Sequence, residues 1–343
     1  MLVISPSGQF YGSEQVLFDY LSRSVINSKV FLPNKGNFYL RLRKLIDEDR
    51  LSVFLSLWIL YLRVGWLCYT RQADHIYLNE GGHNKYGLLL ASLFPRVSVV
   101  IHLRILEDTK LERWSKELPH NVKLVSISKF IQGKVPFPSV QLYDPYPFSD
   151  KFFFNNLRES ANPFKIGIIG RIGYSKGFEY ILELLGHPWL LKNRPNWEFF
   201  FYGEMTSEII ESGKSDFLVN HPMVKLMGFV SNKTEIYNGV DCILHAAKEE
   251  PLGRIFLEAI DHLLPFVGFD SGGIGEIAHN VGYTTNLCSE FDDGTGLLLK
   301  LINVSNVNNG EYRELIDVKE RANAIFSLDS YCNRLDGIIT SNL

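Results

Sequence analysis

Two carboxylates eight residues apart, Glu250 and Glu258, mark the part of this 343-residue chain whose residue types best suit ligand chemistry. An apolar strand is predicted to end at Ala246, and Glu250 lies in the polar loop that follows it. A helix is predicted to begin near Leu252 or Gly253, directly after that loop. Helix N-termini at this edge of a parallel α/β sheet carry unpaired N–H groups and a partial positive charge. The spacing therefore predicts a site for an anionic ligand, most simply a phosphate.

The predicted helix ends at Leu264, because Pro265 cannot extend it. A strand from Pro265 to Phe269 follows and leads into a tight turn at residues 270–273. Glu258 shares one helical face with three other polar residues: Arg254, Asp261 and His262. The apolar stripe, predicted to be buried, contains Phe256, Leu257, Ile260, Leu263 and Leu264. Taken alone, the polar face is typical of a solvent-exposed helix surface.

Two cations follow another predicted strand, at residues 165–170. Arg171 and Lys176 lie on the loop between this strand and a predicted helix at residues 178–185. A guanidinium group can grip two oxygens and an ammonium group adds a point charge, so the pair suits a diphosphate. The glycines of this segment do not match G-x-G-x-x-G, which argues against a nicotinamide-dependent oxidoreductase.

Together these residues resemble the signature of the retaining glycosyltransferases of family 4, which have the GT-B fold. Glu250 and Glu258 match the family's E-x7-E motif, and Arg171 and Lys176 match its G-R-x-x-x-x-K-G motif. The resemblance implies that Glu258 holds the ribose hydroxyls of a nucleotide sugar and that Glu250 holds the donor sugar. It also implies that Arg171 and Lys176 bind the diphosphate.

The same resemblance adds further donor-binding positions in the second half of the chain: Gly203, Phe229, Val230, Leu252, Gly253 and Arg254. It implies that Gly203 and the turn from Gly228 to Val230 approach the nucleotide base through the backbone. The helix start near Gly253 is expected to meet the diphosphate. Because backbone contacts carry no base identity, the base is not predicted.

The first half resembles the family more loosely, at the ends of its predicted strands. Gly12 and Ser13 belong to a variant of the family's G-G-x-E loop, in which Tyr11 replaces the first Gly. The fourth predicted strand, residues 75–79, ends at Asn79, and the fifth, residues 97–102, ends at His102, with Arg104 two residues later. The resemblance implies that Asn79, His102 and Arg104 face the donor sugar and the acceptor, with His102 among the catalytic residues. Asp144 stands where many members of the family have Asn.

The alternation of strands and helices indicates an α/β protein with two domains, a division that the chain length also suits. The first domain is expected to span residues 1–155 and the donor-binding domain residues 160–326, with a linker around residues 145–156. A helix at about residues 327–343 is expected to pack back on the first domain. The family's GT-B fold implies two Rossmann-like domains facing each other across a cleft.

Composition is that of a globular protein, with 46% apolar and 21% charged residues. The four cysteines have no metal-ligand or disulfide spacing, and the chain begins with an apolar strand rather than a basic leader, so a reducing cytoplasm is expected. Residues 1–155 hold 19 Lys and Arg against 13 Asp and Glu, whereas the remainder holds 16 against 25. The basic first half suggests contact with an anionic partner, although chance asymmetry explains it equally well.

Residues 51–69 are the most apolar segment, with Arg63 as their only formal charge. A spanning helix there would split the α/β pattern, so a strand followed by a helix is predicted. If Trp58, Tyr61 and Trp66 face outward, the helix could rest on an anionic membrane surface; the alternative is a large buried helix. Nearby, Asp47-Glu48-Asp49 matches the D-x-D metal motif of another glycosyltransferase fold, but its context favours solvated acids.

The resulting hypothesis is a metal-independent, retaining hexosyltransferase of the cytoplasm or the inner membrane face. It would use a nucleotide sugar and a saccharide or lipid-linked acceptor in cell-surface polysaccharide biosynthesis, such as lipopolysaccharide or capsule. The alternatives are a sugar-nucleotide epimerase on the same fold and an inactive nucleotide- or glycan-binding homologue. No contact with nucleic acid is expected.

Overall fold

The computed structural model describes residues 1–113, 115–150, 162–289, 294–306 and 311–341. Contacts divide the chain into two compact units: Met1–Pro147 with Phe326–Leu343, and Phe148–Ile325. The change of unit after Pro147 comes earlier in the chain than residue 155. Half of the predicted linker, residues 151–156, lies outside the described residues.

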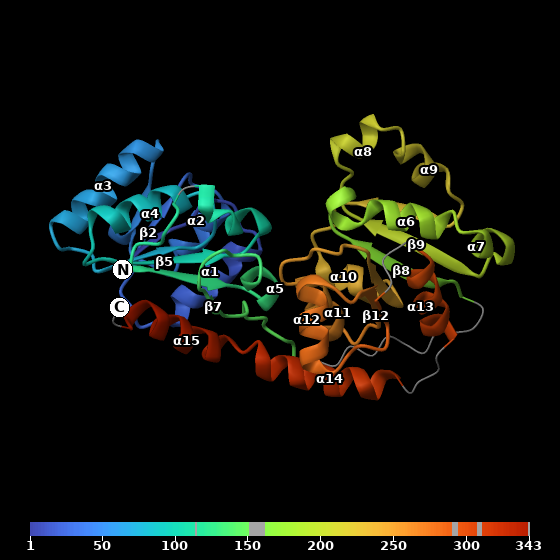
Figure 1. Cartoon of the computed structure of the whole chain (residues 1–343). Helices are drawn as coiled ribbons and strands as arrows, with labels where there is room; N and C mark the ends of the chain where they lie inside the picture. Colours follow the sequence, from blue (N-terminus) through green and yellow to red (C-terminus); the bar gives the residue numbers. More distant parts are fainter. Residues whose placement is uncertain (114, 151–161, 290–293, 307–310, 342–343) are drawn as a thin grey trace. The chain divides into compact units, whose positions relative to one another are not determined.

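The first unit contains a parallel seven-stranded sheet in the order β3-β2-β1-β4-β5-β6-β7 (Figure 1). Its strands are β1 (Leu2–Ile4), β2 (Lys29–Leu32), β3 (Leu51–Val53), β4 (His75–Leu78), β5 (Ser98–Leu103), β6 (Val122–Ser126) and β7 (Val140–Gln141). Its α-helices are α1 (Gly12–Arg23), α2 (Asn37–Leu42), α3 (Leu57–Tyr69), α4 (Asn84–Leu93), α5 (Lys129–Gln132) and α15 (Leu328–Thr340). The order reverses between β1 and β4, and in doubly wound sheets ligands bind outside the carboxyl ends of the strands at such a reversal.

The second unit repeats this plan with a parallel six-stranded sheet in the order β10-β9-β8-β11-β12-β13. Its strands are β8 (Phe164–Ile169), β9 (Trp197–Tyr202), β10 (Val224–Gly228), β11 (Cys242–His245), β12 (Phe266–Phe269) and β13 (Leu287–Cys288). Its α-helices are α6 (Phe178–Leu185), α7 (Pro188–Asn193), α8 (Ser207–Glu211), α9 (Ser215–Asn220), α10 (Lys233–Asn238), α11 (Arg254–Asp261), α12 (Gly272–Val281), α13 (Thr295–Asn306) and α14 (Glu311–Ile325). The reversal here falls between β8 and β11.

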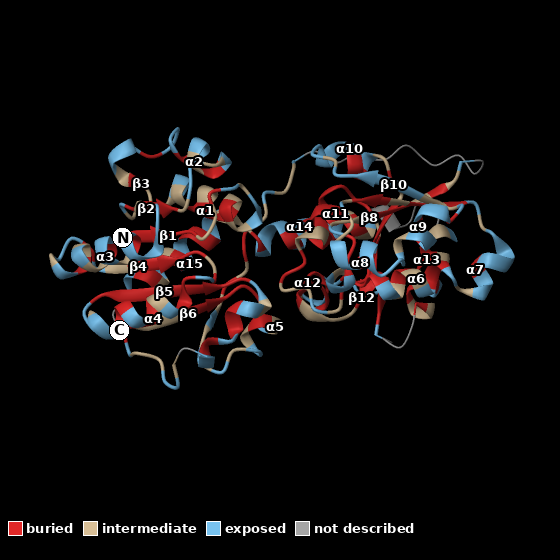
Figure 2. Cartoon of the chain, turned by 90° about the horizontal axis from the view of Figure 1, so that it is seen from above, coloured by how far each residue is buried: buried red, intermediate tan, exposed pale blue. Residues whose placement is uncertain are grey.

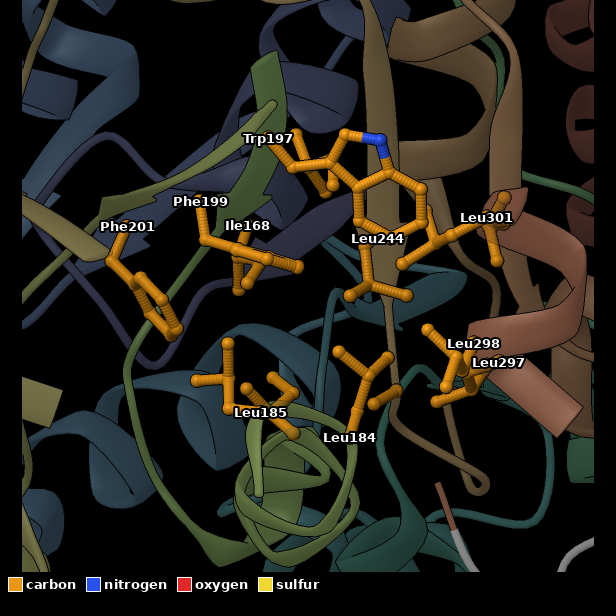
Figure 3. Close-up of a cluster of buried hydrophobic side chains, with 14 of the residues drawn as sticks. Ile168, Leu184, Leu185, Trp197, Phe199, Phe201, Leu244, Leu297, Leu298 and Leu301 are labelled. Carbon is orange, nitrogen blue, oxygen red and sulfur yellow. The ribbon is translucent and has the colours of Figure 1, made fainter. Parts of the chain in front are cut away.

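Alternate side chains of the second sheet build a core against α6 and α13. Phe199 and Phe201 of β9 point to one side of the sheet together with Ile168 of β8 (Figure 3). Leu184 and Leu185 of α6 close that side, joined by leucines of α13. Each aromatic ring removes a large apolar area from water, so this layer fixes the strand ends that carry the loops described below.

The C-terminal helix α15 completes the first unit. The rings of Tyr331 on α15 and Tyr20 on α1 meet edge to face with centroids 6.3 Å apart. Lys123 donates hydrogen bonds from Nζ to the carbonyls of Ile338 (2.9 Å) and Ser341 (2.6 Å). These contacts join the last residues of the chain to a sheet built from the first ones.

Three sequence predictions of local structure need correction. Helix α11 ends at Asp261 rather than Leu264, because Leu263 adopts a left-handed backbone conformation (φ 53°). Helix α14 was missed, since the apolar pattern weakens after Leu301. The polar face of α11 is buried: Lys319 on α14 lies 3.0 Å from the Asp261 carboxylate.

The structure shows how the two segments with alternative interpretations, residues 47–49 and 51–69, are folded. Asp47-Glu48-Asp49 leads into the 3₁₀ turn Glu48–Arg50, where Glu48 pairs with Arg43 on the surface. Helix α3 turns apolar side chains outward, and the ribbon of α3 in Figure 2 carries the colour of exposed residues over part of its length. Within the described residues, no helix combines the length and the apolar character that crossing a membrane requires.

Candidate functional site

The loops that follow β8 and β11 bring three predicted or neighbouring side chains together. Lys176 donates a hydrogen bond from Nζ to Oε2 of Glu250 at 2.6 Å. The Nε2 atom of His245, the last residue of β11, lies 3.4 Å from the same carboxylate oxygen. Because β8 and β11 flank the reversal of strand order, this cluster lies where ligands bind in doubly wound sheets.

Two glycines let the backbone approach this closely. Gly177 has φ 75°, and a Cβ there would lie 2.0 Å from the carbonyl oxygen of Ala246, in the loop after β11. Gly203 has φ 152°, and a Cβ there would lie 2.0 Å from the carbonyl oxygen of Gly170. Only glycine fits at both points, so the loops after β8, β9 and β11 are held together through backbone contacts.

The Glu250 carboxylate is ionised at neutral pH. Burial by itself raises its pKa, but the His245 imidazole and the Lys176 ammonium outweigh burial and lower the pKa to about 2. At neutral pH the negative charge of the Glu250 carboxylate therefore lies beside the positive charge of the Lys176 ammonium group. This arrangement can accept hydrogen bonds from ligand hydroxyls while the cation meets an anionic group.

Arg171 is exposed and lies at the start of the same loop as Lys176. Arg171, Lys176 and His245 line a small cavity of about 10 Å³, large enough for one water molecule. The structure therefore gathers the two predicted diphosphate-binding cations with His245 and Glu250. Arg171 and Lys176 lie at the edge of the sheet formed by the carboxyl ends of its strands, where α11 also begins.

The start of α11 is fixed by close packing against α12. Gly253, the residue before the helix, has φ 89°, and a Cβ there would lie 2.4 Å from Cγ1 of Ile274. The N–H of Gly273 donates a 2.7 Å hydrogen bond to the Glu250 carbonyl. Leu252 is buried, and Arg254 is the first residue of α11. The predicted donor residues 252–254 thus form a rigid helix start beside Glu250.

Glu258 is buried on the second turn of α11 rather than solvated. Its Oε2 accepts a 2.6 Å hydrogen bond from the Tyr237 hydroxyl, and its Oε1 pairs with Lys233. His262 stacks on the Tyr237 ring with centroids 4.6 Å apart. The carboxylate predicted to bind ribose is therefore oriented by α10, leaving 11% of its side chain exposed.

The predicted base-binding positions lie at the ends of neighbouring strands. Gly203 follows β9, while Phe229 and Val230 follow β10, which pairs with β9 in parallel. The Phe229 ring is 77% exposed. These residues share the edge of the sheet that carries Arg171 and Lys176.

In the first unit, the structure links the predicted residues His102 and Arg104 in a buried network. The Nδ1 atom of His102 lies 2.8 Å from the Tyr77 hydroxyl and 3.3 Å from Nη2 of Arg104. Arg104 pairs with Asp144 and donates a 3.3 Å hydrogen bond to the Tyr331 hydroxyl of α15. Asp144, which stands where the family has Asn, is therefore the counterion of a buried arginine.

Protonation in this network follows from burial and charge. Burial, and after it the charge of Arg104, lower the pKa of His102 well below its ordinary value, so the ring is neutral at pH 7. Burial also opposes the charge of Arg104, but the Asp144 carboxylate outweighs it and raises the pKa of Arg104. His102 is fully buried and Arg104 nearly so.

The remaining first-unit predictions lie beside this network. Asn79 donates a 3.3 Å hydrogen bond to the Ser13 carbonyl, and its own carbonyl accepts one of 2.7 Å from Nε of Arg104. The Ser13 hydroxyl donates a 2.7 Å hydrogen bond to Glu80. Gly12, the first residue of α1, is exposed. The segments that follow β1 and β4 therefore meet where the strand order of the first sheet reverses.

Several contributors were missed by sequence reasoning. His245 carried a usable signal, because it ends a buried strand and His102 lies one residue before the end of another. Tyr237, Lys233 and Tyr331 carried none, since their partners lie 21, 25 and 227 residues away in the chain. Within the parts of the chain that the structure describes, no group of three or more His, Cys, Asp or Glu side chains could hold a metal ion.

Comparison with known proteins finds a family model that matches most of the second unit and solved structures that share the fold of the chain. Residues 149–304 match the family model described as Glycosyl transferases group 1. Curated protein sequences contain no match. HepE of Anabaena, solved in complex with UDP-glucose, is 16% identical over 99% of both chains, with a TM-score of 0.76.

Two further solved structures share the architecture over full length. The lipopolysaccharide outer core galactosyltransferase WaaB is 15% identical over 100% of this chain and 99% of its own, with a TM-score of 0.72. WaaG, a glycosyltransferase involved in lipopolysaccharide biosynthesis, is 14% identical over 100% of both chains, with a TM-score of 0.67. The predicted GT-B fold of two Rossmann-like domains is thereby confirmed, and residues 149–304 are similar to the group 1 glycosyl transferases.

Proposed function

We propose that this protein transfers a sugar from a nucleoside diphosphate sugar to a saccharide or lipid-linked saccharide, with retention at the anomeric carbon. The observation that carries the proposal is the cluster of Arg171, Lys176, His245 and Glu250 at the reversal of the second sheet. This cluster lies within the residues that match the group 1 glycosyl transferases.

The main chemical requirement of the transfer is positive charge that stabilises the departing diphosphate, and the cations of the cluster supply it. As the bond from the anomeric carbon to the phosphate oxygen breaks, negative charge grows on the diphosphate. Arg171, Lys176 and the N-terminus of α11 stabilise that charge without a metal ion. The acceptor oxygen bonds to the same face of the anomeric carbon, and its proton passes to the departing phosphate oxygen.

The two glutamates act as binding groups in this proposal. Glu250 stays ionised, accepts hydrogen bonds from donor-sugar hydroxyls and holds Lys176 in place. Glu258, already aligned by Tyr237, accepts hydrogen bonds from the two ribose hydroxyls. Neither needs to attack carbon, so the pair differs from the nucleophile and acid of a retaining glycosidase.

A thermal-shift panel of nucleoside diphosphates, with and without magnesium, tests the donor site. UDP is the first probe because the HepE structure contains it. A ligand that binds only the folded protein raises its stability, so one diphosphate should raise the melting temperature equally with or without magnesium. The rise should disappear in Glu258→Ala and persist in Glu235→Ala, an acidic control on α10. No rise with any nucleotide would refute the proposal, and sugar release from donor alone would favour an epimerase.

We further propose that the first unit contacts an anionic membrane surface through the exposed side chains of α3 and α4, here called the α3–α4 face. This contact would bring the enzyme to lipid-linked acceptors of cell-surface polysaccharide at the inner membrane face. Large apolar side chains on this face are more than half exposed: Trp58, Leu62, Trp66 and Tyr69 on α3, and Leu89 and Leu93 on α4. Tyr61 and Tyr86 stack between the two helices with centroids 4.1 Å apart, so the face is continuous. Neither helix contains Asp or Glu, whereas α3 carries Arg63 and α4 carries Lys85.

This combination of aromatic rings and cations suits an anionic lipid interface. The protein should sediment with vesicles that contain phosphatidylglycerol and much less with pure phosphatidylcholine. Trp58→Ser with Trp66→Ser should weaken sedimentation at least tenfold, whereas Trp189→Ser on α7 should not. Equal sedimentation of both variants would exclude the α3–α4 face as the contact.

A further inference from the structure

The Glu250 carboxylate is contacted by two side chains at the same oxygen atom. Lys176 donates a 2.6 Å hydrogen bond to Oε2, and Nε2 of His245 lies 3.4 Å from that same atom. No hydrogen bond reaches Oε1 from any residue that the structure describes, and 18% of the Glu250 side chain is exposed. Glu250 therefore offers Oε1 to a ligand, while Oε2 is used by the protein.

The two contacts on Oε2 differ in rigidity. His245 is 5% exposed and ends β11, which pairs with β8 on one side and with β12 on the other. Its ring lies beside the ring of Phe266 on β12, with centroids 6.4 Å apart. Lys176 reaches Glu250 from a loop on a flexible four-carbon stem, and 33% of its side chain is exposed. His245 is therefore the fixed contact and Lys176 the adjustable one.

Glu250 is also the acceptor that the buried His245 nitrogen needs. Nε2 is buried and makes no hydrogen bond of good geometry within the described parts of the chain. A buried N–H group without an acceptor is costly, so a small movement that shortens the 3.4 Å contact is favourable. Hydrogen bonds in the sites of free enzymes are often long and shorten when a ligand binds.

The charge of Glu250 reflects the same contacts. Burial by itself raises the pKa of this carboxyl group, but His245 and, after it, Lys176 lower the pKa to about 2. The contact with His245 is the largest of the lowering effects. Both neighbours thus favour the ionised form, which only accepts hydrogen bonds and so suits a ligand hydroxyl.

Lys176 has a second role in the proposed reaction, whereas His245 has none. The ammonium group is drawn toward the diphosphate as negative charge grows there. The cavity that His245 lines with Arg171 and Lys176 has a volume of about 10 Å³, which admits one water molecule and no phosphate group. His245 can therefore keep Glu250 oriented while Lys176 is engaged by the leaving group.

We infer that His245 is a positioning residue: it fixes Oε2 of Glu250 so that Oε1 accepts a hydrogen bond from a hydroxyl group of the donor sugar. His245 then acts on the sugar part of the donor and not on its nucleotide part. The identity of the ligand rests on the proposed function, whereas the contact between His245 and Glu250 can be tested without any ligand.

Two substitutions of equal length separate the hydrogen bond from packing. His245→Gln places an N–H donor near the position of Nε2, and His245→Met does not. Isothermal titration calorimetry of the full chain uses UDP and the tightest-binding of UDP-glucose, UDP-galactose and UDP-N-acetylglucosamine. His245→Met should weaken the sugar nucleotide at least about fivefold and UDP less than about twofold, whereas His245→Gln should change neither by more than about twofold. The control His221→Met, at a buried histidine that precedes β10, should change neither.

Unfolding in urea tests the contact without a ligand. Because His245→Met and Glu250→Gln remove the same contact, their effects on the unfolding equilibrium constant should not multiply. The double variant should fall short of the product by at least about fivefold. The effects of His221→Met and Glu250→Gln should multiply within about twofold, as expected for independent sites.

Each outcome decides one part of the inference. Equal binding of the sugar nucleotide by the Met and Gln variants would overturn the positioning role. An equal loss of UDP binding in His245→Met would make His245 a phosphate ligand instead, and multiplying effects in urea would remove its contact with Glu250. If neither UDP nor a sugar nucleotide binds the wild type, the proposed function fails together with the sugar contact, and the urea measurement still decides whether His245 holds Glu250.

Discussion

The Lys176–Glu250 pair should give the second unit a pH-dependent stability that a single substitution removes. The pKa of Glu250 is lowered from 4.5 to about 2 in the folded protein, because His245 and Lys176 outweigh burial. A carboxyl group with a lowered folded-state pKa binds fewer protons in the folded state than in the unfolded one. Its contribution to the free energy of unfolding is therefore complete above about pH 5, and it is lost as the pH falls from about 4.5 to about 2.

The size of this contribution follows from the shift. Each pKa unit corresponds to about 1.4 kcal/mol, so Glu250 contributes on the order of 3 kcal/mol at pH 7. By linkage, about 2 kcal/mol should remain at pH 3.5 and about 1 kcal/mol at pH 2.5. For a unit of this length, 1 kcal/mol corresponds to about 2–4 °C in melting temperature. Glu250→Gln should therefore melt roughly 6–12 °C below the wild type at pH 7, with a gap that shrinks by more than half by pH 2.5.

Differential scanning calorimetry of both proteins from pH 7 to pH 2.5 measures that gap. Lys176→Met should shift the acid transition to higher pH, because the pKa of Glu250 rises when the nearby cation is removed. The control is Lys214→Met, which removes an exposed cation 3.2 Å from Glu179 in the same unit and should leave the transition unchanged. A constant gap between wild type and Glu250→Gln at every pH would refute the assignment of a low pKa to this carboxyl group.

Three further predictions concern other contacts. In thermal melts, Gly177→Ala should destabilise the protein by several kcal/mol more than Gly213→Ala. Both glycines have a left-handed backbone (φ 75° and 72°), but only at Gly177 would a Cβ lie 2.0 Å from a carbonyl oxygen. Equal melting temperatures of the two variants would contradict this prediction. Asp144→Asn should lower the free energy of unfolding, measured in urea, by about 3–5 kcal/mol, because it leaves the buried Arg104 without a counterion. The control Asp329→Asn breaks the exposed pair with Arg23 and should lower the free energy of unfolding by less than about 1 kcal/mol. Lys176→Ala should fold and lose about 10²–10³-fold in sugar transfer, measured as release of nucleoside diphosphate, and a wild-type rate would remove the role assigned to Lys176.

Local pattern was enough to predict which loops carry the candidate site residues. The loops after the strands at residues 164–169 and 242–245 were located from buried apolar runs that end in polar residues, and parallel strands bring such ends to one edge. The meeting of Lys176 and Glu250, 74 residues apart, follows from that topology. The shared edge of the sheet was therefore predictable from the alternation of strands and helices, whereas the order of the strands comes from the structure.

Contacts between helices that are far apart in the sequence could not be predicted from local pattern. The burial of Glu258 depends on Tyr237 and on the packing of α14 against α11. In α14, a charged residue, Lys319, lies on the buried face and pairs with Asp261, so the apolar pattern of this helix is interrupted. Likewise, the hydrogen bond from Arg104 to Tyr331 links residues 227 apart. Periodicity reports which face of a helix is polar, but only the partner decides whether that face meets water.

The two charged pairs of the predicted site are suited to different roles because they differ in exposure. Arg104 and Asp144 are almost completely buried, so replacing one partner by a ligand would strand a charge away from water, and the pair is best suited to fixing His102 and Asn79. Lys176 and Glu250 keep 33% and 18% of their side chains exposed. An ammonium group has three donors, so Lys176 can bind a phosphate oxygen while it keeps its hydrogen bond to Glu250. The first pair therefore supplies rigidity, and the second keeps a cation beside the point where a leaving diphosphate would gain charge.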